Sequence, residues 1–247
     1  TNPYSFGAAA PPAFTNTYSL DFDGANDYME AVGGTHMTLD ICSYGMWIKT
    51  SAVGAGTPFM LHQAFYLYMI STPSGYAAWV NHPIGLLNTS TTDIGDGNWH
   101  FFCVTTEGGS GVSSSVKLYI DGALDVTLSA TTTYTVVTNE DLKIGRFEVD
   151  SSGWAGLYYN GNLDEVSIWK NTTLSAAEIT TLYNSGVPIG LSSDSGNYTS
   201  SGALTHWWRM GDPDGTSEYP TIEDVAGSLD GTMINMVDSD ITEDVPS

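Results

Sequence analysis

Positively charged side chains are scarce in this sequence of 247 residues. Lys and Arg total 6 against 28 Asp and Glu, which gives a formal net charge of -22 at pH 7. A nucleic-acid or anionic-membrane interface needs clustered Lys and Arg, and six scattered cations cannot supply one. We therefore expect neither partner. The acidity is explained by solubility, or by Asp residues that chelate a hard cation such as Ca²⁺, and both explanations can hold together.

Cysteine and long apolar runs are scarce as well. The two cysteines, Cys42 and Cys103, are too few for a disulfide framework, and both lie in strand-like stretches. Buried free thiols are the default expectation, while a bridge between them stays open because a sequence does not report their separation. No apolar run approaches the ~20 residues of a membrane span. No charged and apolar signal segment is visible at the start of the sequence.

The motifs of common catalytic sites are also missing. The five histidines lack zinc-ligand spacing, no nucleophile elbow is present, and no glycine-rich phosphate loop precedes a helix. Glycoside hydrolysis needs two carboxylates that flank one bond. Asp164 and Glu165 are adjacent, and neighbours on a regular strand point to opposite faces. We therefore predict that the protein is not an enzyme.

What the sequence does have is alternation of apolar and polar residues, broken by turns. Leu20 and Phe22 alternate with Asp21 and Asp23, as in a half-buried strand. Asp121-Gly122 between two apolar runs is a strong hairpin signal. Further strands are expected at 28–32, 39–49, 59–70, 76–80, 98–105, 142–146, 163–169, 206–210 and 233–236. This pattern predicts an all-β fold, a two-sheet antiparallel β-sandwich.

One short peripheral helix and an N-terminal arm complete the expected organisation. Ser175 as N-cap and Glu178 three residues later fit a capping box, and Gly186 can close the helix, which we expect to cover one edge of the sandwich. Residues 1–17, with three prolines, read as an extended arm that lies across a neighbouring subunit or forms a surface tail. Residues 18–247 read as one domain, with extra strands at about 203–247.

Several short segments resemble one family when they are taken in order. They are residues 19–24 with 27–29, 46–49, 97–100, 118–122, 142–145 and 161–169, the last followed by the helix. Together they resemble the laminin-G-like, concanavalin A-like lectin-glucanase jelly-roll superfamily over about residues 18–186. The remainder, with Trp207-Trp208 and 230–233, is loosely similar to the ends of marine bacteriophage structural proteins. The resemblance implies a concanavalin A-like jelly roll that binds glycans or proteins, often with structural Ca²⁺.

Three aspartates are the candidate calcium ligands. The turn at 23–27 supplies Asp23 and Asp27, and hard cations prefer carboxylate and carbonyl oxygens. In domains similar to this one, the acidic residue at the place of Asp164 approaches the first turn. We therefore predict a site formed by Asp23, Asp27 and Asp164. The alternative is that the residues of the turn bind no metal and instead stabilise the turn through side-chain hydrogen bonds to the backbone.

Aromatic and amide side chains are the candidate glycan ligands, because sugars are held by aromatic faces and planar polar groups. The candidates expected to be exposed include Tyr66, Tyr68, Tyr76 and Asn81, and the predicted ligand-binding residues are Trp154, Tyr158, Tyr159, Trp79 and His82. The alternative for each of them is a place in the core or in a subunit contact.

Three functions are left, in this order. The first is a non-catalytic virion surface or structural protein, such as a capsid decoration, fibre or tail component of a bacteriophage. Its partners would be other virion proteins or copies of itself in a homo-oligomer, together with cell-surface glycans. The second is a secreted or cell-surface carbohydrate-binding adhesin. The third is a polysaccharide-active enzyme, which would need a carboxylate pair in a cleft.

Overall fold

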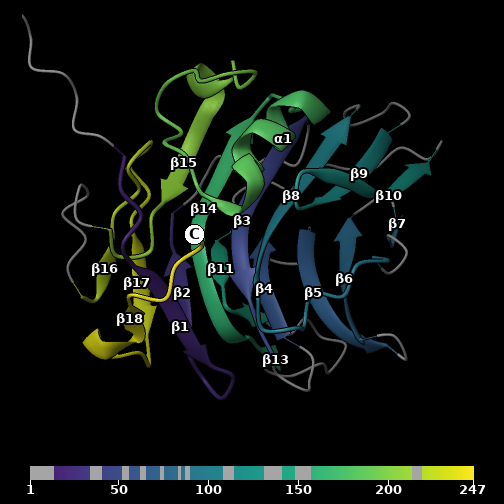
Figure 1. Cartoon of the computed structure of the whole chain (residues 1–247). Helices are drawn as coiled ribbons and strands as arrows, with labels where there is room; N and C mark the ends of the chain where they lie inside the picture. The colour runs from purple at the N-terminus through teal and green to yellow at the C-terminus, as the bar shows by residue number, and fades with distance from the viewer. Residues whose placement is uncertain are drawn as a thin grey trace, which may run out of the picture.

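The fold consists of two large antiparallel sheets that face each other, with one helix on the outside (Figure 1). The computed structural model describes residues 14–33, 41–51, 56–61, 65–72, 75–82, 85–86, 90–107, 114–130, 141–147, 157–212 and 219–247. This arrangement confirms the predicted β-sandwich with a short helix. No helix among these residues is long and apolar enough to cross a membrane.

Sheet A contains eight of the described strands. Their order is β10 (Ala123–Ala130), β9 (Ser114–Ile120), β8 (Trp99–Glu107), β3 (Cys42–Lys49), β14 (Asn160–Lys170), β1 (Ser19–Asp23) and β18 (Ile241–Thr242). The eighth strand, β15 (Leu204–Trp208), pairs with the second half of β14, on the side where β1 pairs with the first half. The predicted hairpin is present, with Asp121 and Gly122 both at positive φ between β9 and β10.

Sheet B also contains eight described strands. Their order is β16 (Thr221–Ile222), β17 (Gly231–Ile234), β2 (Tyr28–Ala31), β11 (Leu142–Ile144), β4 (Gly56–Leu61), β5 (Phe65–Thr72), β6 (Gly75–His82) and β7 (Gly85–Leu86). A separate two-stranded pair, β12 (Arg146–Phe147) with β13 (Leu157–Tyr158), follows β11. The last strands of the chain thus extend both sheets.

The main core lies between the two sheets. Alternate residues of each strand enter it, for example Tyr44, Met46 and Ile48 from β3 and Met29 and Ala31 from β2. This alternation follows from the two-residue period of a strand. Cys42 belongs to this core, whereas Cys103 faces the other side of sheet A, and both are buried free thiols. The default expectation for the cysteines is therefore confirmed.

The helix covers a face of the sandwich rather than an edge. Helix α1 (Ala176–Tyr183) begins with the predicted capping box, in which the Ser175 side chain accepts a hydrogen bond from the Glu178 amide. It ends at Asn184, whose backbone is left-handed, and Gly186 closes the short 3₁₀ turn that follows. Figure 1 shows α1 in front of sheet A. Ile179 and Leu182 of α1 are buried in a second core on that outer face.

A β-bulge in β14 overturns one prediction from the sequence. Glu165 has a φ of 51°, and the register with β3 shifts between Asp164 and Ser167. The extra residue places Glu165 on the same outer side of sheet A as Asp164, because a bulge interrupts the strict alternation of a strand. The prediction that these two carboxylates point to opposite faces is therefore wrong.

Candidate functional site

A second core covers the outer face of sheet A over β3, β8 and the second half of β14. Trp47, Phe101, Cys103, Tyr119 and Trp169 rise from the strands of this face. Leu174, Ile179, Leu182, Leu191 and Tyr198 of the α1 region and the following loop cover them. The Trp169 indole donates to the Tyr198 hydroxyl at 3.0 Å, which in turn donates to the Leu191 carbonyl at 3.0 Å. A glycan therefore cannot reach β3, β8 or the second half of β14 from this side.

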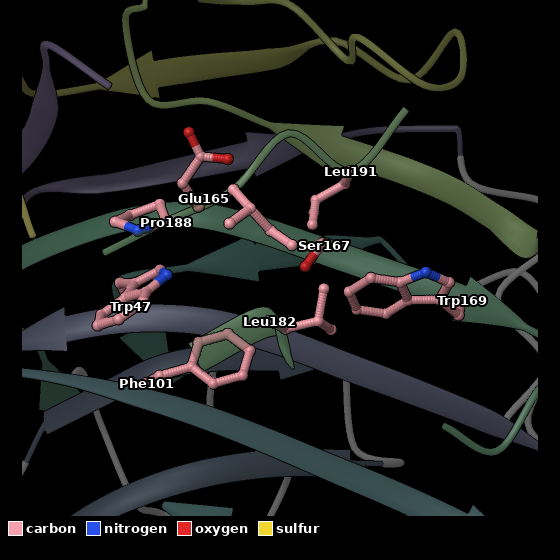
Figure 2. A pocket seen from close by; sticks show the side chains of 9 residues that line it. Trp47, Phe101, Glu165, Ser167, Trp169, Leu182, Pro188 and Leu191 are labelled. Carbon is pink, nitrogen blue, oxygen red and sulfur yellow. The ribbon is translucent and has the colours of Figure 1, made fainter. Parts of the chain in front are cut away.

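One cavity under this cover is small. It lies between β3, β8, β14 and the segment after α1, and Figure 2 shows Trp47, Phe101, Glu165 and Trp169 around it. Its volume of about 10 Å³ is enough for about one water molecule. A sugar ring does not fit into this space, so the cavity is not a carbohydrate site.

The register of sheet B brings four of the nine candidate glycan positions to its outer face. Leu67 and Met69 of β5 are buried in the core, so the alternate positions Tyr66 and Tyr68 belong to the outer face. Tyr68 pairs with Trp79 and Tyr66 pairs with Asn81. Residues directly opposite on antiparallel strands share a face. The register therefore brings two tyrosines, a tryptophan and an asparagine together in two adjacent rows.

One of these rows continues across the sheet to charged residues. Tyr66 pairs with Met60, Met60 with Lys143, and Lys143 with Glu30. The Lys143 ammonium forms an ion pair with the Glu30 carboxylate on this face. Two residues before Glu30 on β2, the centre of the Tyr28 ring lies 4.8 Å from the Arg146 guanidinium, which is 5.8 Å from the centre of the Tyr158 ring. Tyr158, a predicted ligand residue, is half-buried there.

The other predicted glycan ligands are not brought to one place. Tyr159 is 1% exposed, and its hydroxyl donates to the Lys49 carbonyl at 3.0 Å, so it is a core residue and the ligand prediction is wrong for it. Val80 pairs with the core residue Leu67. His82 lies two residues after Val80 and so shares its face of β6, which is the face opposite to that of Trp79. Trp154 lies outside the described residues.

The three predicted calcium ligands do not meet either. Leu20 pairs with Leu163 and Asp23 with Asn160, so Asp164 lies four residues, or about 13 Å, along β14 from the turn. Asp164 is fully buried and accepts a hydrogen bond from the Asn16 amide at 2.9 Å. In the turn, Asp23 accepts from the Ala25 and Asn26 amides, and Asp27 accepts from the Asp23 amide. These residues do not fit a three-carboxylate cation site.

A buried charge cluster lies where Asp164 is found, and the sequence analysis missed it. The Arg209 guanidinium donates to Glu165 at 3.1 Å and to Asp212 at 2.6 Å, and the Trp207 indole donates to Glu165 at 2.5 Å. All four side chains and Asp164 are at most 3% exposed. The sequence feature that could have indicated this cluster is Arg209 itself, because it directly follows two tryptophans in a chain that has few cations.

Burial changes the protonation of this cluster. Desolvation raises the pKa of Glu165 to about 7, against the opposing effect of Arg209, and it also raises the pKa of Asp164 well above its usual range. The folded state therefore holds protons that the unfolded state releases near pH 4.5.

Stability is expected to fall as the pH rises from about 5 to 8, because a raised folded-state pKa contributes stability that is lost at higher pH. The contribution of Glu165 is on the order of 3 kcal/mol. Urea unfolding of Glu165→Gln across this range is expected to show a weaker fall than the wild type. If the free energy of unfolding falls equally steeply with pH in the variant and the wild type, Glu165 does not have a raised pKa in the folded state.

Two His–Asp pairs brace the ends of sheet A. Asp224 accepts hydrogen bonds from His206 Nδ1 at 2.6 Å and from the Trp207 amide at 2.9 Å. Asp121 does the same for His100 Nδ1 at 2.8 Å and the Phe101 amide at 2.9 Å. Each carboxylate thereby ties a strand to a distant turn. His100 and His206 have structural partners in these pairs, which explains them without a catalytic role.

Comparisons with known proteins agree with this architecture. Residues 23–180, more than half of the chain, match the family model described as the Concanavalin A-like lectin/glucanases superfamily. A candidate carbohydrate-binding protein from Bacteroides ovatus ATCC 8483 superposes with a TM-score of 0.66 at 16% identity, over 94% of this chain. This chain spans 62% of the length of that protein.

A second solved structure has the same fold. The heptameric SAP-like pentraxin from Limulus polyphemus superposes with a TM-score of 0.55 at 16% identity, over 88% of this chain and 95% of the pentraxin. No curated protein matches the sequence. The family match and the two-sheet architecture together show that the chain belongs to the concanavalin A-like lectin/glucanase superfamily.

Proposed function

We propose that the protein is a non-catalytic, lectin-like module that binds carbohydrate on the outer face of sheet B. The observation that carries the proposal is what covers each of the four faces of the two sheets. Two of the four faces form the main core, and α1 with its following loop covers the middle of the third. The fourth gathers Tyr66, Tyr68, Trp79 and Asn81 by register. Aromatic rings and amides in adjacent rows offer the flat apolar and hydrogen-bonding contacts that a sugar requires.

The absence of catalysis is part of this proposal. The two adjacent acids, Asp164 and Glu165, are buried under the N-terminal residues and engaged by Asn16 and Arg209. A glycosidase needs two carboxyl groups that reach the scissile bond. Buried acids that lie on the closed side of sheet A do not meet this requirement.

A glycan array with the wild type and Trp79→Ala tests the proposal. The wild type is expected to bind at least one glycan class, and the variant to lose at least about tenfold in affinity, or about 1.4 kcal/mol, because an aromatic contact surface is removed. The matched control is Trp99→Ala, since Trp99 lies at the other sheet and its indole donates to Asp244. Wild-type affinity in a folded Trp79→Ala protein, or no binding by the wild type, would contradict the proposal.

The biological setting is a narrower proposal. A virion surface component and a cell-surface adhesin would both use the same binding face, and the virion role rests on the loose likeness of the C-terminal part to phage structural proteins. Genes for capsid or tail proteins beside this gene would support the virion role. A polysaccharide or export locus would support the adhesin.

A further inference from the structure

The described part of the N-terminal arm lies on its own domain. We call residues 14–18 the strap, and the surface formed by Asp164, Trp207, Arg209 and Asp212 the groove. The strap crosses the outer side of sheet A at the junction of β14 and β15 and leads directly into β1. Its contacts with the groove are specific at each of its five residues.

The strap is recognised through both side chains and backbone. The Phe14 ring stacks on Trp207 at 6.3 Å and lies 4.5 Å from the Arg209 guanidinium, and the Thr15 carbonyl accepts from Arg209. The Asn16 amide donates to Asp164 at 2.9 Å. The amides of Thr17 and Tyr18 donate to one Asp212 oxygen at 2.8 and 3.2 Å. An aromatic ring, an amide and a short extended backbone are thus read by separate groups.

The groove is held in shape by contacts that do not involve the strap. Glu165 holds Arg209 and Trp207, and Arg209 holds Asp212. The Glu165 amide donates to Asp164 at 2.8 Å, and Trp207 and Ser167 pair across β15 and β14. Charge-assisted hydrogen bonds within a strand framework give a preorganised surface. No residue of the strap belongs to the main core, and Phe14 packs on the second core. Release of the strap would therefore leave the packing between the two sheets in place.

We propose that the groove is a peptide-binding site for an extended segment with an aromatic residue followed two positions later by an amide residue, and that the strap is its resident occupant. The strap then blocks the site in cis, and a second segment of the same chemistry competes with it. This site lies on the side of sheet A, opposite the face proposed for carbohydrate, and does not depend on that proposal.

The test uses the full chain carrying Phe14→Ala and Asn16→Ala, with a fluorescein-labelled peptide of the wild-type residues 11–18 as the probe. Fluorescence anisotropy is expected to show binding to the variant at least tenfold tighter than to the wild type, because the wild-type strap competes at a millimolar effective concentration. A peptide with both residues replaced by alanine is the matched control and is expected not to bind. A folded variant that does not bind the wild-type peptide would overturn the proposal.

Hydrogen exchange of the wild type keeps the proposal testable if the variant does not fold. The amides of Thr17 and Tyr18 are expected to exchange at least 100-fold faster than the core amides of β14, because the strap opens locally. Exchange of both sets at the same rate, through global unfolding alone, would show that the strap is a fixed part of the fold and would overturn the proposal.

Discussion

Replacing Arg209 with alanine is expected to lower the free energy of unfolding by about 3–5 kcal/mol. Arg209 is 2% exposed and forms ion pairs with Glu165 and Asp212. Its removal takes a charged hydrogen-bond donor from Glu165 and from Asp212, whose side chains stay buried. In a domain of this size, the loss corresponds to a fall of about 10 °C in Tm.

The matched control for Arg209→Ala is Lys117→Ala. Lys117 forms an ion pair with Glu107 at 2.5 Å, but both side chains are substantially exposed. Exposed pairs contribute at most about 1 kcal/mol. Thermal and urea unfolding of both variants at pH 7 compares a buried cation with an exposed one. A loss no larger for Arg209→Ala than for Lys117→Ala would contradict the structural role of the cluster.

Replacing Asp224 with alanine is expected to lower the free energy of unfolding by a comparable amount, about 3–4 kcal/mol. The Asp224 side chain is fully buried and accepts hydrogen bonds from His206 and from the amides of Trp207, Gly227 and Leu229. Alanine leaves these donors buried without an acceptor, and each such group costs about 1–3 kcal/mol. The strand β15 then loses its tie to the segment before β17.

Asp194→Ala is the corresponding control for Asp224→Ala. Asp194 also accepts side-chain and backbone hydrogen bonds, from Ser201, but at an exposed site where water can replace them. Its loss is expected to stay within about 1 kcal/mol. Differential scanning calorimetry of the two variants measures the difference, and similar midpoints would refute the proposed brace at Asp224.

Features set by a few neighbouring residues could be predicted from the sequence. The capping box at Ser175 and Glu178 and the turn at Asp121-Gly122 are determined by local backbone geometry, and both are present. The alternating pattern also predicted the sandwich, since a strand with one apolar face requires a second layer.

Features set by distant pairings could not be predicted in this way. The bulge at Glu165 reverses the side of one residue, and no local motif announces it. The register of β1 against β14 separates Asp164 from Asp23, although both occupy the expected strands. Tyr159 resembles a loop aromatic in the sequence, but its hydroxyl satisfies the Lys49 carbonyl inside the core.

The layer that covers the outer face of sheet A could also be predicted from the sequence. Strands β3 and β8 carry apolar residues at both odd and even positions, and therefore on both faces. Examples are Tyr44, Met46 and Trp47 in β3, and Phe101 and Phe102 in β8. Continuous burial of this kind is typical of a strand with both faces covered. It predicts a layer outside the middle of sheet A, which the helix and its following loop provide.

The most direct test of the binding face is hydrogen–deuterium exchange with and without a glycan that the array identifies. The glycan is expected to protect β5 and β6, residues 65–82, from exchange and to leave residues 176–203 on the outer side of sheet A unchanged. Protection confined to residues 176–203, with residues 65–82 unaffected, would contradict it.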